Sequence, residues 1–147
     1  MRQPMRAPIA IMAALLLALA LLPGCGKKAW PEPVKAEDRF DFAEPRAMLA
    51  GGCLAVEVPV VGSVQNLAEI ILEIGPADCP DCPMRVARWF SYDDPSTFMP
   101  EPGMVRVKAC DLTPNAAVRW RLRGVNSLSR TAQAATGDRI TEPAARP

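Results

Sequence analysis

Two cysteines separated by two residues, in the motif Cys79-Pro80-Asp81-Cys82, offer the clearest candidate chemistry in this chain. The C-x-x-C spacing is typical of thioredoxin-like redox sites, where a helix N-terminus or a nearby cation stabilises the reactive thiolate. Here Gly75-Pro76 precede the motif and Pro83 follows it, which indicates a loop without a βαβ context. We therefore expect a structural role for this motif and no redox activity.

The cysteines also raise the question of a metal site. Four thiolates can hold a zinc ion, and the chain has five cysteines but no histidine. Only one C-x-x-C pair is present, which makes a tetrathiolate site the weaker interpretation. Without histidine the sequence lacks the commonest general base and metal ligand, and it contains no evident nucleophile–base pair or carboxylate dyad. We expect a protein that is not an enzyme and binds no metal or cofactor.

Basic residues alternate with apolar ones between Val118 and Arg123. The basic members, here called the arginine stripe, are Arg119, Arg121 and Arg123. Alternate residues of a β-strand point to the same face, so the stripe would be a positive surface to which Arg85 and Arg88 could add. Guanidinium groups suit phosphate or carboxylate recognition, for example of lipid A phosphates or an acidic partner. The alternative is a solvated sheet face on which acidic neighbours neutralise the arginines.

The N-terminus has the parts of a secretory signal. Arg2 and Arg6 form a positive region, and the uncharged stretch 7–22 follows them. Its 16 residues fall short of the roughly 20 that a transmembrane helix needs, so a permanent anchor is the weaker interpretation. The signal therefore predicts export of the rest of the chain.

The end of this signal, Leu22-Pro23-Gly24-Cys25, resembles the lipobox of bacterial lipoproteins. The resemblance implies cleavage before Cys25 and acylation of that cysteine, whereas the alternative is a simple signal peptide with an incidental cysteine. Gly26 stands where enterobacterial lipoproteins retained in the inner membrane have Asp, so the resemblance favours the outer membrane, facing the periplasm. The start Cys25-Gly26-Lys27-Lys28 also looks like that of very small lipoproteins that assist assembly of the outer-membrane lipopolysaccharide translocon.

Size and charge limit what the exported part can be. Removing 24 residues leaves 123 of the 147, enough for one domain with a single core. Two of the 17 basic residues leave with the signal, so 15 basic residues face 16 acidic ones, which argues against a nucleic-acid binder. Residues 26–38 contain lysines and prolines with little apolar periodicity, and this composition predicts a linker.

Apolar residues recur at every second position in several short segments, the pattern of half-buried β-strands. The predicted strands are 53–61, 69–74, 84–92, 104–110, 118–123 and 131–136, with Phe40 and Phe42 in a first strand. In the segment 84–92, Trp89 and Phe90 cannot both face inward. Six or seven short strands without a convincing amphipathic helix indicate a single antiparallel β-sandwich.

The stretch from Leu112 to Arg130 resembles the F-strand region of fibronectin type III domains. That family has Leu-x-Pro, a strand of alternating apolar residues, and then Ala-Val-Asn before the final strand. The matching residues are Leu112-Thr113-Pro114, Trp120, Leu122, Gly124-Val125-Asn126 and Arg130. Val118 stands in place of the family's usual corner tyrosine, and Gly124 in place of its common Ala. The resemblance implies a fibronectin type III or immunoglobulin-like sandwich, but a fold does not imply a function.

Four cysteines remain after lipidation, and in an exported protein we expect disulfides with three pairings open. The type III resemblance places strand B antiparallel to strand E, which implies Cys53–Cys110 across that sheet and Cys79–Cys82 as a local clip. The long closure would stabilise the fold by about 4 kcal/mol. The same resemblance puts Glu69 and Glu73 on the strand beside the arginine stripe, which favours cross-strand salt bridges over ligand binding there.

The predicted organisation is a signal peptide (1–24), a lipidated N-terminus and linker (25–38), a β-sandwich (39–140) and a disordered tail (141–147). We expect a lipid-anchored lipoprotein of the cell envelope whose sandwich is a non-catalytic binding or structural module. Its expected partners are membrane lipid, through acylated Cys25, and an envelope protein or glycan, but no nucleic acid. The alternative is an assembly factor or accessory protein of outer-membrane or lipopolysaccharide transport machinery.

Overall fold

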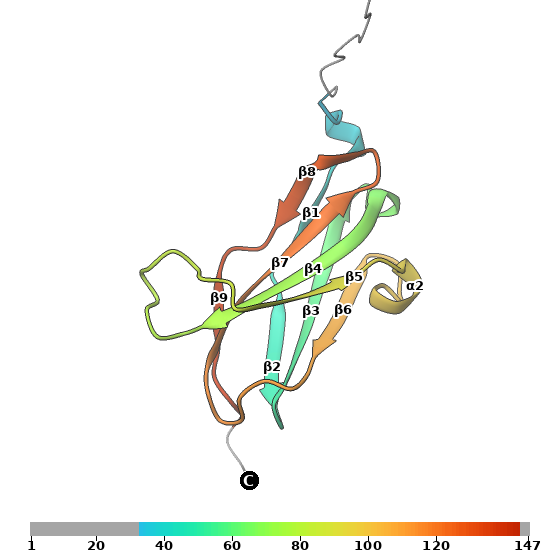
Figure 1. Ribbon diagram of the computed structural model, residues 1–147. Coiled ribbons are helices and arrows are strands. Elements are labelled where there is room, and N and C mark those ends of the chain that lie inside the picture. The colour runs from blue at the N-terminus through green and yellow to red at the C-terminus, as the bar shows by residue number, and fades with distance from the viewer. Residues whose placement is uncertain (1–32, 145–147) are drawn as a thin grey trace, which may run out of the picture. The chain divides into compact units, whose positions relative to one another are not determined.

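Short antiparallel strands make up most of residues 33–144, the part of the chain that the computed structural model describes (Figure 1). The strands are β1 (Phe40–Phe42), β2 (Arg46–Ala50), β3 (Cys53–Gly62), β4 (Leu67–Pro76), β5 (Arg88–Tyr92), β6 (Met104–Ala109), β7 (Val118–Asn126), β8 (Ser129–Ala135) and β9 (Arg139–Thr141). One short helix, α2 (Pro95–Phe98), and two 3-10 turns, η1 (Ala36–Asp38) and η2 (Val64–Asn66), complete the described elements. The predicted signal peptide and Cys25 lie outside these residues. Among residues 33–144, no helix has the length and apolar character needed to cross a membrane.

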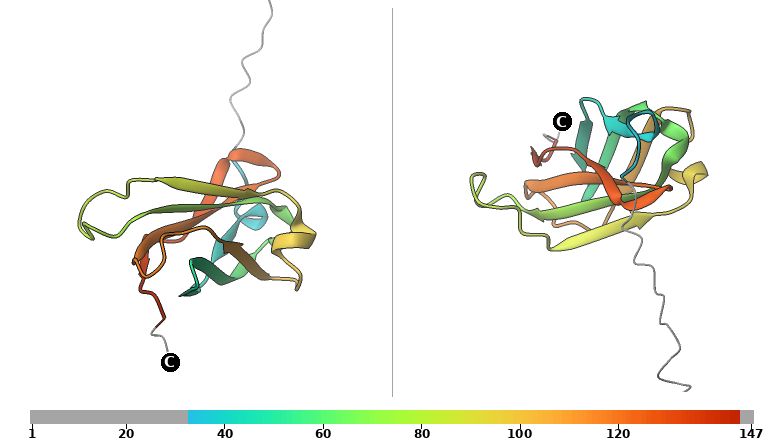
Figure 2. Two further views of the ribbon diagram at one scale, coloured as in Figure 1. Left: turned by 60° about the horizontal axis from the view of Figure 1, so that its bottom comes forward. Right: turned by 90° about the horizontal axis from the view of Figure 1, so that it is seen from above.

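The strands form two sheets that face each other, so the predicted all-β sandwich is confirmed (Figure 2). In the four-stranded sheet, β3 pairs with β6 along one edge and with β1 and β2 along the other. In the five-stranded sheet, β4 lies between β5 and β7, and β8 and β9 follow each other along the far edge of β7. Every one of these strand pairs is antiparallel.

The break between β1 and β2 has a cause in the sequence of β3. β1 pairs with residues 60–62 and β2 with residues 53–57, so the gap lies opposite Val58 and Pro59. The Val60 N–H donates to the Gly103 carbonyl, on the β6 side of β3. Adjacent residues of a strand direct their N–H groups to opposite sides, so an N–H at position 59 would point toward β1 and β2. Proline has no N–H to give, and the pairing is interrupted there. The Pro59 carbonyl still accepts from the Ala43 N–H at 2.9 Å.

The inward residues of both sheets build one apolar core. In β3, β4, β6 and β7, the alternate apolar residues that were predicted to face the core are buried. The largest core side chain, Trp120, is 2% exposed. Its indole N–H donates to Thr141 Oγ1 at 2.8 Å, which satisfies the one polar atom that this residue brings into the core.

Both predicted ends of the domain change. Glu37 and Asp38, assigned to the linker, are attached to the sandwich: Ser63 Oγ donates to the Glu37 carbonyl, and the Asn66 and Asn126 amides both donate to the Asp38 carbonyl at 2.9 Å. Residues 141–144, assigned to a disordered tail, continue from β9 across to the other sheet, where the Ala144 N–H donates to the Leu49 carbonyl at 2.8 Å. Residues 145–147 lie outside the described part.

Strands β2 and β9 and helix α2 were not predicted. β2 (RAMLA) is apolar at four of its five positions and β9 (RIT) has only three residues, so neither shows a clear period of two. They form because β3 and β7 offer them free edges. Helix α2 has only four residues and starts at an Asp94 cap that accepts from the Ser96 N–H at 2.9 Å. It places Phe98, which is fully buried, over the open side between the two sheets.

The packing around Gly124 accounts for a glycine at the position where type III domains commonly have alanine. A Cβ atom there would lie 2.7 Å from Phe40 Cε2, 2.8 Å from Phe42 Cζ and 3.0 Å from Leu67 Cδ1. We expect Gly124→Ala to lower the free energy of unfolding by about 1–3 kcal/mol, because three packed side chains must move. Urea denaturation measures this change. Gly137→Ala is the control, since nothing lies within 4 Å of its Cβ position, and equal effects of the two substitutions would contradict the packing argument.

Candidate functional site

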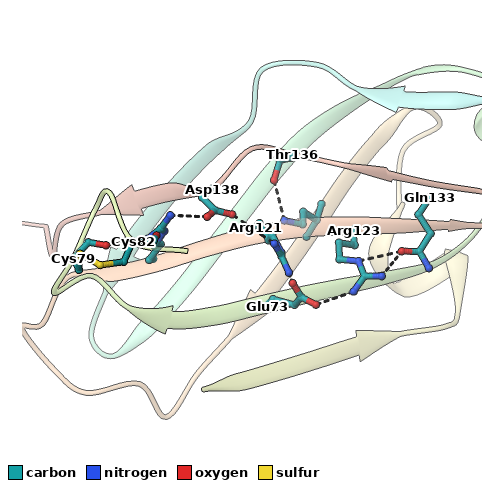
Figure 3. Close-up of polar contacts among 10 residues, drawn as sticks. Glu73, Cys79, Cys82, Arg121, Arg123, Gln133, Thr136 and Asp138 are labelled. Atoms are coloured by element: carbon teal, nitrogen blue, oxygen red, sulfur yellow. Dashed lines mark hydrogen bonds and ion pairs between the residues drawn. A yellow bond between two sulfur atoms is a disulfide. The ribbon is translucent and has the colours of Figure 1, made fainter. Parts of the chain in front are cut away.

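The outer face of the five-stranded sheet carries a connected set of charged side chains (Figure 3). The arginine stripe alternates with the buried apolar residues of β7 and therefore points outward, as predicted. Directly opposite Arg121 on the neighbouring strand is Glu73 of β4, and on the far side of Glu73 is Trp89 of β5. This cross-strand row puts the stripe beside a carboxylate instead of leaving it open to solvent.

Glu73 binds two arginines at once. Arg121 Nε donates to Glu73 Oε2, and Arg123 Nη1 donates to Glu73 Oε1 at 2.9 Å. The Glu73 side chain is 10% exposed although it belongs to the outer face. Arg123 is held further by Gln133 Oε1, to which its Nε donates at 3.1 Å. The predicted cross-strand salt bridges are therefore confirmed for Glu73, whereas Glu69 accepts a hydrogen bond from Ser91 Oγ at 2.6 Å.

Two opposing effects set the protonation of Glu73. Burial alone would raise the pKa of this carboxyl, but the hydrogen bonds and positive charges of Arg121 and Arg123 outweigh it and lower the pKa below its ordinary value. Glu73 is thus held as a carboxylate, and its two oxygens are occupied by guanidinium groups. A carboxylate in this state is a fixed structural anion and a poor general base.

Arg119, the third member of the stripe, is 8% exposed and does not face solvent. Its Nη1 donates to the carbonyls of Cys79 at 3.0 Å and Cys82 at 2.6 Å, and its Nη2 pairs with Asp138 at 2.7 Å. The sequence offered this arginine as an anion or partner contact, and the structure instead uses it to fasten the loop between β4 and β5 onto the sheet. That loop is the long excursion between the two strands in Figure 1.

Asp138 reaches the stripe because the edge strand is broken. β8 pairs with residues 123–126 of β7 and β9 with residues 118–120, so residues 136–138 bridge the gap. In this gap Thr136 Oγ1 accepts from the Leu122 N–H at 2.9 Å, and Asp138 lies between Arg119 and Arg121, 3.9 Å from the latter. A carboxylate in a strand break can reach two arginines on the same side of the neighbouring strand.

The four cysteines form the two disulfides that the type III resemblance implied, Cys53–Cys110 and Cys79–Cys82. The first joins the start of β3 to the residue after β6, in one sheet. The second closes the tip of the loop between β4 and β5 and presents the two carbonyls that bind Arg119. With all four sulfurs paired in disulfides, none of them is a free thiolate that could bind zinc. Within residues 33–144 no three His, Cys, Asp or Glu side chains group closely enough to hold a metal ion.

Arg85 and Arg88 do not extend the arginine stripe. Arg88 pairs in register with Ile74 of β4, whose side chain points inward, so Arg88 belongs to the opposite face. Its guanidinium lies 5.0 Å from the centroid of the Phe90 ring and donates to the Asp111 carbonyl at 2.6 Å. Arg85 forms an exposed pair with Asp78 at 3.5 Å. The positive surface that five arginines would make is therefore absent from the described residues.

Beside the paired charges is a shallow groove, which we call the Trp89 groove. Its volume is about 470 Å³. It is lined by Glu69, Ile71, Glu73, Trp89, Arg123, Val125, Arg130 and Gln133. Trp89 is 67% exposed, the highest fraction among the large apolar side chains of the described part. The prediction that Trp89 and Phe90 face opposite ways is confirmed, because Phe90 packs partly against the core.

A larger hollow of about 590 Å³ lies at the base of the loop between β4 and β5. Its walls are mainly short apolar side chains, among them Ala87, Leu112 and Ala117. The one guanidinium in its lining, that of Arg88, is already engaged by Phe90 and Asp111. The lining also includes the polar side chains of Asp78, Asp111 and Thr113.

In comparisons with family models and with curated proteins, no family model and no curated sequence matches this chain.

Sequence reasoning did not single out Trp89, Asp138 or Gln133 as site residues. The sequence did contain an indication for Trp89, because an aromatic residue on the polar face of a strand is expected to be exposed. It contained none for Asp138 and Gln133, since their roles depend on where the edge of the sheet breaks and on which side chains the neighbouring strand presents.

Proposed function

We propose that this chain is a cell-envelope lipoprotein, anchored by lipid on Cys25, whose β-sandwich is a non-catalytic binding module. The signal pattern and the sequence Leu22-Pro23-Gly24-Cys25 support the anchor, and Gly26 favours the outer membrane, facing the periplasm. Acyl chains on one cysteine would hold the module at the membrane, because each buried CH₂ contributes about 0.8 kcal/mol.

The order of the strands supports a fibronectin type III-like module. With β1 and β2 as a divided strand A, β3 as B and β6 as E, one sheet has the order A-B-E. With β5, β4 and β7 as C′, C and F, and β8 and β9 as a divided G, the other has the order C′-C-F-G. The Cys53–Cys110 disulfide joins B to E, the neighbours from which its pairing was inferred.

A single observation carries the binding role: Trp89 is 67% exposed at the side of a groove that also contains the Arg123–Glu73 ion pair. Tryptophan is enriched among the residues that contribute most of the binding energy at contact surfaces. Glu73, held between Arg121 and Arg123, is a poor general base. The arrangement is suited to holding a partner and not to transforming one.

Crosslinking in the native cell tests this role. A photoreactive amino acid at position 89 of the full chain is expected to give a discrete crosslinked species in the membrane fraction. The same amino acid at position 48 is the control, because Met48 is 61% exposed but lies on the other sheet. Absence of an adduct at position 89, or equal adducts at both positions, would contradict the assigned surface. In the same cells, labelled palmitate is expected to be incorporated into the wild-type chain and not into Cys25→Ser, and absence of label on the wild-type chain would contradict the anchor.

A further inference from the structure

The Trp89 groove combines one exposed aromatic side chain with several polar groups in its lining. Trp89 lies directly opposite Glu73, a member of the charged row, on the neighbouring strand. Ile71 and Val125 supply the apolar parts of the lining. Carboxylate, guanidinium and amide groups make up the rest, and all three are planar groups with several hydrogen-bonding atoms. The groove therefore offers stacking and directional hydrogen bonds together.

The charges of the groove cancel. Its two carboxylates, Glu69 and Glu73, face two guanidinium groups, Arg123 and Arg130. The Arg123–Glu73 pair is direct, at 2.9 Å. An anion entering the groove would meet Glu69 and Glu73 and would compete with Glu73 for Arg123, so phosphate recognition is disfavoured. The charge balance selects for a ligand without net charge.

The polar groups are also positioned in advance. Arg123 is held between Glu73 and Gln133, and Glu69 accepts from Ser91 Oγ at 2.6 Å. Each of these groups retains further donors or acceptors, since a guanidinium has five N–H donors and a carboxylate about four acceptor sites. A ligand that hydrogen-bonds to them pays little to order them, which favours binding by small neutral molecules.

On this basis we propose that the Trp89 groove binds a neutral oligosaccharide, an assignment that rests on the proposed binding role of the same face. A sugar ring presents C–H groups on its faces, which stack on an indole, and hydroxyls at its rim, which both donate and accept hydrogen bonds. The rim hydroxyls would meet the carboxylate of Glu69 and the donors of Arg123, in charge-assisted hydrogen bonds.

A protein partner fits this groove less well. The cores of protein interfaces are depleted in charged residues, whereas Trp89 is bordered by Glu73 and the groove contains Glu69, Arg123 and Arg130. Covering these groups with a protein surface would remove water from several charges at once. The free energy of this desolvation exceeds the gain from new ion pairs unless every charge meets an opposite charge. A sugar replaces that water with hydroxyls and leaves the rim of the groove solvated.

Isothermal titration calorimetry on the full chain tests the assignment, with chitotetraose and cellotetraose as neutral probes and inorganic phosphate as the anionic one. The chain is kept in a zwitterionic detergent, because glycosidic detergents would compete for the groove. We expect saturable binding of at least one oligosaccharide and a loss of up to about tenfold in affinity for Trp89→Ala, since tenfold corresponds to the upper range for one aromatic contact. Trp89→Phe should retain part of the affinity, and Met48→Ala all of it.

The outcomes separate this assignment from the proposed function. The exposed position of Trp89 predicts an unchanged urea midpoint for Trp89→Ala, so its lost affinity would report on the contact and not on folding. Failure of both oligosaccharides to bind, full affinity of Trp89→Ala, or displacement of the sugar by phosphate would each overturn the saccharide assignment. If position 89 crosslinks to a protein in cells while neither sugar binds, the binding module stands and the ligand class is wrong.

Discussion

Replacement of Cys53 and Cys110 together by alanine is expected to lower the free energy of unfolding by about 4 kcal/mol. The two cysteines are 57 residues apart in sequence, and the chain between them includes β4 and β5 of the other sheet. Without the crosslink, the unfolded chain gains the conformational freedom of that whole loop. For a domain of this size the loss is a large fraction of the total stability. Urea denaturation of the variant under non-reducing conditions measures it.

The matched control is the other disulfide. Cys79 and Cys82 are 3 residues apart, and the same chain-entropy model gives about 2 kcal/mol for replacing both by alanine. The order of the two effects is the sharper test. If loss of the short clip costs as much as loss of the long crosslink, the carbonyls that the clip presents to Arg119 would outweigh loop closure, and the entropic argument would fail.

The second large effect is expected at Glu73. Glu73→Gln removes the charge that binds Arg121 and Arg123 and leaves both guanidinium groups, each about one-third exposed, without their main partner. Breaking a buried pair costs about 3–5 kcal/mol, and the partial exposure of the arginines reduces this to roughly 2 kcal/mol at neutral pH. Glu69→Gln is the control, because Glu69 lies on the same strand and face but bonds to Ser91.

The pH dependence of this difference has a definite sign. The pKa of Glu73 is lowered by folding, so the wild-type chain gains stability above the unfolded-state pKa of a glutamate, about 4.3, and loses it as pH falls through the lower folded pKa. The gap between wild type and Glu73→Gln should therefore be full at pH 7 and close as the pH falls below about 4. A gap that is constant from pH 7 to pH 3 would show that the carboxylate charge is not its source.

On the outer face of the five-stranded sheet, the local sequence pattern predicted some features, and the tertiary structure decided others. The alternation in β7 was enough to place the arginine stripe outside and Trp120 inside, because side-chain direction in a strand has a period of two. It was not enough to say what the arginines do. Arg121 and Arg123 meet Glu73 only because β4 pairs with β7 in one register, and a shift by one residue would separate them.

By itself, the sequence determined the class of fold, the four main core strands, the pairing of the cysteines through a family resemblance, and the outward direction of the stripe. Apart from the cysteine pairing, which rests on the resemblance, these follow from periodicity and turn residues, which act over a few residues. Tertiary structure alone decided that Arg119 is buried under the Cys79–Cys82 loop, that Asp138 reaches it through a break in the edge strand, and that Trp89 borders a groove. Those contacts join residues 16 to 40 positions apart, and their geometry depends on register, strand breaks and loop paths that no local pattern encodes.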